Sequence, residues 1–492
     1  MIHGYPQDPT VTAGDTLVLR VATDAPRFRV DFYRQGEALE LAARTEWLAG
    51  HRRPLHLPYQ DWGVDNTGLQ GERLTAWPAY SFPIPDVWPA GVYVAMLVEG
   101  DGRGREVTSL DFGTPDARDS KALFVVAPPG GGARSPILYK LPLFTYHAYN
   151  RVTPESYNPV TRQGGWSLYT VPRPGDLPRA VPPAVSVRRP GGGTGGTPWD
   201  MFNLDPFDPT PRQTFVHWDA PFVGWLERSG YAVDFCTDLD LHRDGDGRLL
   251  AGRSLLLCAG HDEYWSEAMR RNVDAFVGGG GNVAFLCGNT CWYHVSFDDD
   301  FAFRRLHRWS DPECGNPENA LTGVSYRNGG ERRATDELRP FGYTVQHADH
   351  WIYEGTGLRE GETFGDGPHQ HLVGYECDGA EFDRSALREG VAARPMGGDG
   401  TPLDFVILAV SDVSLGGWGL GNGAATMGLY TRNGTVFTAS TTDWVRVVAR
   451  GLAPEADCIT RNVLDRLGRT RTSVEGRRRS SRPGASRPPP RR

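Results

Sequence analysis

The feature that most constrains the fold is an apolar run that leads directly into charged residues near the middle of the chain. Residues 255–258 read Leu-Leu-Leu-Cys, a pattern typical of a strand buried on both faces. The run ends at Gly260, and His261, Asp262 and Glu263 follow it directly. The sequence therefore predicts a buried strand that ends in groups able to do chemistry. A structural alternative carries equal weight, in which His261 and Glu263 cap the following helix and bond to each other.

A helix and a second buried strand follow this segment. Apolar residues between 269 and 277 recur at helical spacing, and the glycines at 278–281 are a strong stop signal. Residues 283–287 form a second apolar run, which ends in Gly288 and Asn289. Ligands of open α/β sheets bind outside the carboxyl ends of the strands. The two strand ends together predict a functional site at one edge of a sheet.

Composition narrows the class of protein. A chain of 492 residues is too long for one core, so we expect two or more domains. The net charge of −8 argues against a nucleic-acid-binding body. No apolar run could span a bilayer and no signal peptide is evident, so we expect no membrane contact. The 7 cysteines include Cys236, Cys258 and Cys287 in strand-like runs, which indicates reduced core thiols in a cytoplasmic protein.

The first part of the chain, residues 1–127, predicts a β-sandwich domain. Strand-like runs occur at 16–22, 28–33, 91–98 and 122–127, with Gly, Pro and Asp between them. Nothing in this part has the character of a catalytic site.

Residues 134–467 predict an α/β domain. Strands and helices alternate between 137 and 287, which favours a mainly parallel sheet covered by helices, in a three-layer arrangement like that of glutamine amidotransferases or Rossmann-like folds. The C-terminal part of this domain is loop-rich, and residues 170–215 predict a long loop. The fold class is thus α/β plus β. Residues 468–492, rich in Arg, Ser and Pro, predict a disordered basic tail.

Polar residues at the strand ends form a candidate metal site. Tyr149 and Asn150 follow one predicted strand, His261 and Glu263 follow another, and Asn289 follows a third. A phenolate and a carboxylate are anionic oxygen donors, which suit ferric iron better than metals that prefer soft ligands. The chain has no His-x-x-x-His motif or cysteine pair of the kind that marks common zinc hydrolases.

These motifs resemble the large (beta) subunit of N,N-dimethylformamidase and its relatives, over most of the chain to about residue 467. The resemblance implies a mononuclear iron amidohydrolase. It rests on motifs in matching order at 145–150 (Thr-Tyr-His-Ala-Tyr-Asn), 164–169 (Gly-Gly-Trp-Ser-Leu-Tyr), 220–227, 261–264, 288–289, 374–376, 436–444 and 460–464.

The resemblance also implies roles for particular residues. Two tyrosines and one glutamate hold the iron (Fe³⁺) in the family. Tyr149 matches the first tyrosine and Glu263 matches the glutamate. His261 and Asn289 match residues beside the metal, and Glu376 matches a further acidic residue of the pocket.

One position departs from the family pattern. The second family tyrosine follows an Arg-Pro pair, but here the pair at 189–190 is followed by Gly191. Tyr169 is the nearest tyrosine that can take its place. We therefore expect Tyr149, Glu263 and Tyr169 as the metal ligands.

The expected function is hydrolysis of a non-peptide C–N bond in a small-molecule amide. A metal would polarise the carbonyl group and activate a water molecule. We expect His261, Glu263, Asn289 and Glu376 to act as catalytic residues that move protons and stabilise the oxyanion.

Two other interpretations compete with this one. In the first, the chain is a catalytically inactive, metal-free member of the family that binds a ligand or partner. In the second, Cys258 or Cys287 is a nucleophile, but neither cysteine lies in a Gly-x-Cys-x-Gly elbow. The sequence leaves open a homo-oligomer and a small partner subunit.

Overall fold

The computed structural model describes most of the chain with several gaps. Residues 130–133, most of the predicted loop at 170–215 and the tail from residue 470 lie outside the described residues. The described residues are 2–51, 77–101, 120–129, 134–150, 167–169, 184–194, 208, 210–297, 301–331, 341–386, 390–414 and 423–469.

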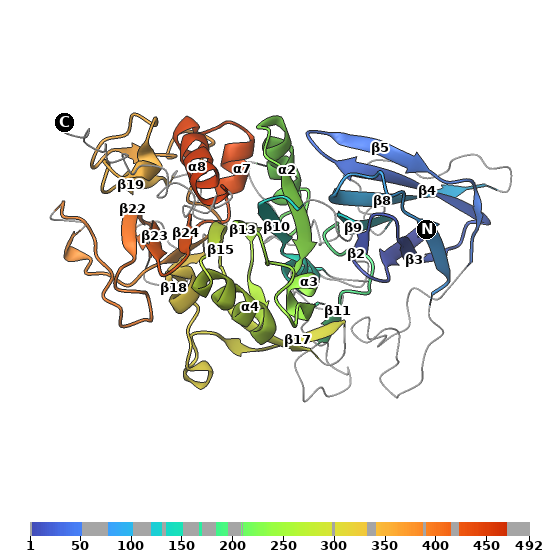
Figure 1. Ribbon diagram of the computed structural model, residues 1–492, viewed down its shortest axis with the longest axis horizontal. Helices are drawn as coiled ribbons and strands as arrows, with labels where there is room; N and C mark the ends of the chain where they lie inside the picture. The colour runs from blue at the N-terminus through green and yellow to red at the C-terminus, as the bar shows by residue number, and fades with distance from the viewer. Residues whose placement is uncertain are drawn as a thin grey trace, which may run out of the picture.

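The N-terminal part consists of two sheets, drawn in blue in Figure 1. Apolar side chains from both sheets, such as Leu19 and Phe32, pack into one core. The described residues of 1–127 form strands and no helix, as predicted. One sheet has the order β1 (Ile2–Pro6), β3 (Thr16–Thr23) and β7 (Ala79–Pro83). The other has the order β2 (Thr10–Thr12), β9 (Lys121–Ala127), β8 (Gly91–Gly100), β4 (Arg27–Gln35) and β5 (Leu39–Arg44), with β6 (Leu48–Ala49) beside β4.

A nine-stranded mixed sheet organises the remainder of the chain. Its first five strands are mutually parallel, as predicted. The other four join antiparallel, which the expectation of a mainly parallel sheet did not include. The strands are, in order across the sheet, β12 (Val233–Thr237), β10 (Ile137–Leu141), β13 (Leu255–His261), β15 (Asn282–Gly288), β24 (Thr435–Thr438), β23 (Ala424–Thr431), β22 (Val406–Asp412), β19 (Tyr343–Val345) and β20 (Thr363–Phe364).

Helices cover both faces of the parallel half, as Figure 1 shows. Alternate residues of β13 explain this burial, because Leu255 and Leu257 pack with one group of helices while Leu256 and Cys258 pack with the other. One face holds α2 (Asp219–Arg228), α7 (Trp444–Ala449) and α8 (Pro454–Leu467). The opposite face holds α1 (Leu143–Tyr149), α3 (Asp238–Arg243) and α4 (Glu267–Gly278).

Two small sheets and three short helices complete the described structure beside these layers. The N-terminal sheet also packs against the α/β part, because Val92 and Val94 of β8 share a core with Phe222 of α2. The small sheets are β11 (Ala184–Ser186), β17 (Ala302–Arg308), β16 (Tyr293–Phe297) and β14 (Tyr264–Ser266), and the pair β18 (Ser325–Glu331) and β21 (Glu376–Gly379). The short helices are η4 (Pro312–Cys314), α5 (Asn319–Thr322) and η5 (Trp351–Tyr353).

Two expectations from composition can be compared with the structure. All seven cysteines are unpaired, and Cys236, Cys258 and Cys287 are buried, as predicted. No helix among the described residues has the length and apolar character needed to cross a membrane.

Candidate functional site

Several strand ends deliver the candidate residues to one edge of the nine-stranded sheet. The chain leaves β10 into α1, whose last residue is Tyr149. The end of β13 supplies His261 and, two residues on, Glu263. Asn289 directly follows β15. Glu376 reaches the same edge because its carbonyl accepts a hydrogen bond of 3.1 Å from the backbone N–H of Thr442, just beyond β24.

Three oxygen-bearing side chains meet at this edge. The Tyr149 hydroxyl lies 2.8 Å from Glu263 Oε2 and 3.0 Å from the Tyr169 hydroxyl. The Tyr169 hydroxyl lies 3.3 Å from Glu263 Oε1. A fourth oxygen, the Tyr264 hydroxyl, is 2.5 Å from that of Tyr169. The structure thus brings together all three residues that the sequence predicted as metal ligands.

The spacing of these oxygens is that of direct hydrogen bonds, and it is also close to the spacing of oxygens around a shared hard cation. Oxygen ligands at about 2.0–2.1 Å from an octahedral ion lie roughly 2.8–3.0 Å apart. The measured separations between Tyr149, Tyr169 and Glu263, from 2.8 to 3.3 Å, are close to that range. Burial, followed by the charge of Glu263, raises the pKa of both tyrosines well above its ordinary value. A phenolate at either position therefore requires a cation to compensate its charge.

His261 lies between the two glutamates of the site. Its Nε2 atom is 2.8 Å from Glu376 Oε2 and 3.5 Å from Glu263 Oε2. Burial alone would lower the pKa of His261, but the carboxylate of Glu376, followed by that of Glu263, raises it. The Nδ1 atom is 2.6 Å from Oε1 of Gln213, which fixes the orientation of the ring. This geometry suits a group that holds and transfers a proton.

Asn289 completes the polar lining and is held by its backbone. Its Nδ2 atom lies 3.2 Å from His261 Nε2 and 3.3 Å from Glu376 Oε2. Its φ of 51° is left-handed, and Asp378 Oδ1 accepts a hydrogen bond of 3.0 Å from its N–H. The buried Oδ1 atom has no hydrogen-bond partner among the described residues. The Oδ1 atom of Asn289 can therefore accept a hydrogen bond from a bound molecule.

A buried ion network supports the loop that carries Glu263. The Lys140 ammonium lies 2.5 Å from Asp238 Oδ1 and 2.7 Å from Asp262 Oδ1, and none of the three side chains is more than 1% exposed. The Thr145 hydroxyl also accepts a hydrogen bond of 3.0 Å from the backbone N–H of Glu263. These contacts tie β10 and α1 to the loop after β13, so they hold Tyr149 and Glu263 in register.

Gly191 occupies the position where the family resemblance places a second tyrosine. Its φ is 82°, a conformation that glycine adopts freely and tyrosine rarely does. Asn150 Nδ2 donates a hydrogen bond of 2.7 Å to the carbonyl of Pro190, so this segment runs beside the end of α1. The local backbone has therefore adapted to glycine at 191, while Tyr169 supplies the second hydroxyl next to Tyr149.

Several residues of the site were not predicted from the sequence. Gln213 lies within the predicted loop and has no motif that could reveal it. Asp378 falls two residues after Glu376, and Tyr264 directly follows Glu263, so both were adjacent to predicted residues. Arg305 of β17 lies with its guanidinium carbon 5.5 Å from the centroid of the Tyr169 ring, and it was not predicted because that strand reads as a weak pattern.

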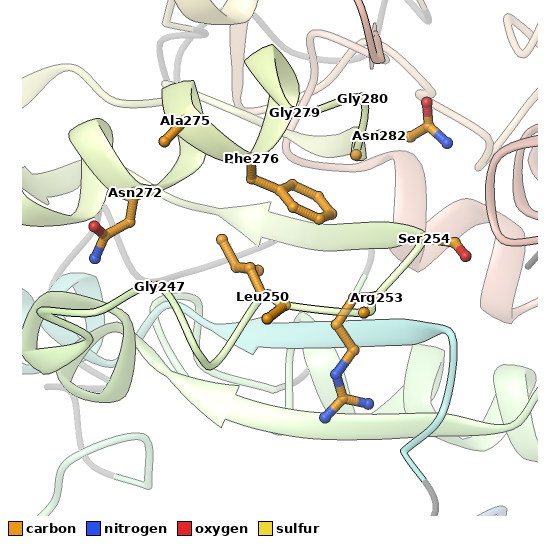
Figure 2. Close-up of a pocket in the computed structure, with 13 residues that line it drawn as sticks. Gly247, Leu250, Arg253, Ser254, Asn272, Ala275, Phe276, Gly279, Gly280 and Asn282 are labelled. Carbon is orange, nitrogen blue, oxygen red and sulfur yellow. The ribbon is translucent and has the colours of Figure 1, made fainter. Parts of the chain in front are cut away.

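A separate cavity of about 490 Å³ lies at the amino ends of β13 and β15, away from the candidate residues. Figure 2 shows Ser254 and Asn282, at the amino ends of the two strands, together with Leu250 and Phe276 along its walls. The candidate residues lie at the opposite, carboxyl ends of the same strands. This cavity is therefore no part of the candidate site.

Comparisons with known proteins match this chain to one family. A family model described as "N,N-dimethylformamidase beta subunit-like, C-terminal" matches residues 28–457. The N,N-dimethylformamidase beta subunit of Paracoccus aminophilus is 26% identical over 353 residues, which cover 63% of this chain and 43% of that protein. The protein of the same name from Alcaligenes sp is 26% identical over 330 residues, which cover 58% of this chain and 40% of that protein. The match therefore spans less than half the length of these relatives.

Proposed function

This chain belongs to the N,N-dimethylformamidase beta subunit-like family, and on that premise we propose that it hydrolyses a small non-peptide amide at the site around Glu263. The observation that carries the proposal is the meeting of a three-oxygen cluster with a histidine placed between two buried glutamates. Glu263 is 2% exposed and Glu376 is 4% exposed. Buried carboxyl groups with a titratable partner are typical of catalytic sites.

Tyr149, Tyr169 and Glu263 would hold a mononuclear ferric iron. The ion would supply Lewis acidity toward the amide carbonyl and lower the pKa of a water molecule. Two phenolate oxygens and one carboxylate provide the anionic, hard donor set that ferric iron favours. The protein itself fixes these donors, because the Glu263 loop is attached to Lys140 through Asp262.

The remaining side chains would move the protons of the reaction. The water oxygen forms a bond to the carbonyl carbon, and the pair of His261 and Glu376 takes its proton. When the C–N bond breaks, the same pair returns that proton to the leaving nitrogen. The Nδ2 atom of Asn289 lies beside both groups, and it would turn away from them to donate a hydrogen bond to the developing oxyanion. An amine and a carboxylic acid result.

Replacing Glu263 tests the assignment directly. We expect Glu263→Gln to lose bound metal and to reduce kcat/KM for amide hydrolysis by about 10²-fold or more, because one anionic ligand is removed. N,N-dimethylformamide is the first substrate to assay, since the relatives carry its name. Metal is measured by elemental analysis and hydrolysis by release of the amine.

Glu318→Gln is the matched control, because Glu318 is also buried (0% exposed) but accepts a hydrogen bond from the Ser325 hydroxyl outside the cluster. This variant should keep both metal and activity. Full hydrolytic activity in Glu263→Gln would refute the assignment. If the wild-type protein binds no metal and hydrolyses no amide, the result would instead support the alternative that this chain is a metal-free binding protein. The main observation in favour of that alternative is Gly191.

The relatives are named as beta subunits, which supports a multi-subunit assembly for this chain as well. We propose that the chain acts as part of such an assembly, as a homo-oligomer or with a small partner subunit. We also propose a cytoplasmic location, on the basis of its unpaired cysteines.

A further inference from the structure

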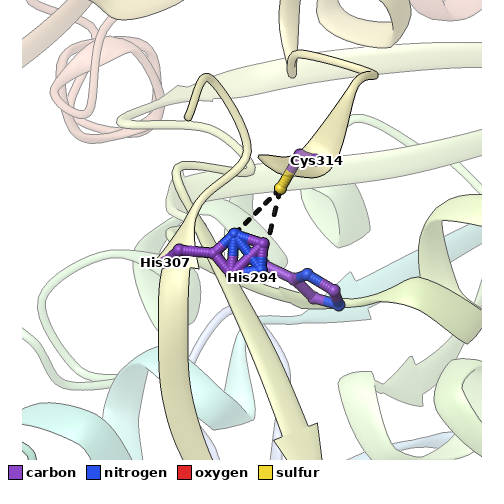
Figure 3. A group of neighbouring side chains, drawn as sticks. All are labelled: His294, His307 and Cys314. Carbon is purple, nitrogen blue, oxygen red and sulfur yellow. Dashed lines mark hydrogen bonds between the residues drawn. The ribbon is translucent and has the colours of Figure 1, made fainter. Parts of the chain in front are cut away.

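A second group of metal-binding side chains lies on the hairpin of β16 and β17, outside the site around Glu263. His294 and His307 are directly opposite each other in the antiparallel register, with ring centroids 5.0 Å apart. Cys314 comes from η4, and its Sγ atom is 3.1 Å from His307 Nδ1. Figure 3 shows the three side chains together. Their ligand atoms all lie within 4.8 Å of one another.

We propose that His294, His307 and Cys314 bind a borderline-soft divalent cation such as Zn²⁺. Two imidazole nitrogens and one sulfur form a donor set that Zn²⁺ accepts, with a fourth position open to water. Ligands at the usual Zn–N and Zn–S distances lie roughly 3.3–3.6 Å apart in a tetrahedron. The present spacing reaches that range after small rotations of partly exposed side chains.

His294 provides an independent observation in support of this site. Its ring stacks on Trp309 with centroids 4.2 Å apart, which fixes its orientation. Its Nδ1 atom is buried and has no hydrogen-bond partner among the described residues. A buried polar atom without a partner destabilises the fold, and a bond to a metal ion would satisfy it. The hydrogen-bonding capacity of this nitrogen atom is therefore unused by the described residues.

One positive charge lies near this group. The guanidinium carbon of Arg270 is 4.6 Å from the centroid of the Trp309 ring, on which His294 stacks. Arg270 is the opposing positive charge, and its guanidinium donates to oxygens of Asn316 and Pro317.

A cation at this position would fix a hairpin that also lines the candidate site. Tyr293 precedes His294, and its ring stacks on Tyr264 with centroids 5.5 Å apart. Arg305, two residues before His307, lies with its guanidinium carbon 4.6 Å from the Tyr293 ring. The site would therefore stabilise the strands that position Tyr293 and Arg305 beside Tyr169 and Glu263.

Cobalt substitution tests the proposal in the full chain. After treatment with a chelator, addition of Co²⁺ should produce a thiolate-to-cobalt charge-transfer band that saturates at one equivalent and disappears when Zn²⁺ is added. The band should be lost in Cys314→Ser. It should also be lost in His307→Gln, a second variant that leaves the thiol in place.

Cys458→Ser is the matched control and should keep the full band. Cys458 is also partly exposed, and its thiol donates to a backbone carbonyl, that of Glu354 at 3.4 Å, as Cys314 donates to Arg308 at 3.3 Å. Absence of a sulfur band in the wild-type protein would overturn the proposal, including the case in which Co²⁺ binds only beside Tyr149 and Glu263. A band of equal strength in Cys314→Ser would overturn it as well.

Discussion

Asp219 is a carboxyl group in the core of the α/β part that forms no ion pair with any described residue. It begins α2 and is 0% exposed, and its oxygens accept hydrogen bonds from Tyr139, at 2.8 Å, and from Tyr146. Burial raises the pKa of Asp219 well above its ordinary value, although the hydrogen bond from Tyr139 lowers it. Burial also raises the pKa of Asp238, to about 7, although the ammonium group of Lys140 beside it lowers that pKa. At the residue scale, both buried acids have raised pKa values, but only the carboxylate of Asp238 contacts a cation.

The raised pKa of Asp219 predicts a pH dependence of folding stability, and Asp219→Asn should remove it. Above pH of about 4 the unfolded chain loses the Asp219 proton while the folded protein keeps it. The folded state then binds more protons, so the stability of the wild type falls as pH rises. Relative to that of Asp219→Asn, the free energy of unfolding of the wild type should fall by at most about 1.4 kcal/mol per pH unit. Chemical denaturation at pH 5, 6, 7 and 8 measures this, and parallel curves for both proteins would contradict it.

At the scale of elements, the candidate site depends on how closely β15 approaches the segment that carries Glu376. Gly288 is the last residue of β15, and a Cβ atom there would lie 2.6 Å from the backbone nitrogen of Thr442 and 2.7 Å from the carbonyl oxygen of Glu376. Neither backbone atom can move without shifting the packed segment of chain to which it belongs. The absence of a side chain at 288 therefore allows Asn289 and Glu376 to meet.

We expect Gly288→Ala to lower stability by about 1–3 kcal/mol, as overpacking does, and to reduce kcat for amide hydrolysis. The change separates Asn289 from Glu376 without removing any polar group. Thermal denaturation and steady-state kinetics are the measurements. Gly278→Ala, at the end of α4, is the control, because a Cβ atom there has no neighbour within 4 Å. Unchanged kinetics in Gly288→Ala would show that this close approach is not needed.

At the scale of the whole molecule, the sequence predicted the parts whose pattern is local. The apolar runs of β13 and β15 and the helical face of α4 identified the parallel half of the sheet, because burial on two faces leaves a continuous apolar run. The antiparallel half was missed, although Asn433 and Gly434 between β23 and β24 are a hairpin signal. Gln213 could not be predicted, since only tertiary packing places it against His261.

The set of side chains at the carboxyl edge was predicted in part. His261, Glu263 and Asn289 follow from the rule that ligands bind at strand ends. Glu376 and Tyr169 came from the family resemblance, because neither lies at the end of a parallel strand. The structure places all five side chains within one cluster. The contacts that hold this cluster in place, such as the buried ion pair of Lys140 and Asp262, leave no pattern in the sequence from which they could be predicted.

The most direct test of the central claim is the iron content and visible absorption of the purified protein. The claim is that Tyr149, Tyr169 and Glu263 hold iron although Gly191 has replaced the family tyrosine. We expect about one iron per chain and a phenolate-to-iron charge-transfer band, and Tyr169→Phe should bind iron more weakly with an altered band. Tyr343→Phe, whose hydroxyl donates to the Ala439 carbonyl at 2.7 Å, should match the wild type. A wild-type protein that stays colourless and free of iron after iron is added would contradict the claim.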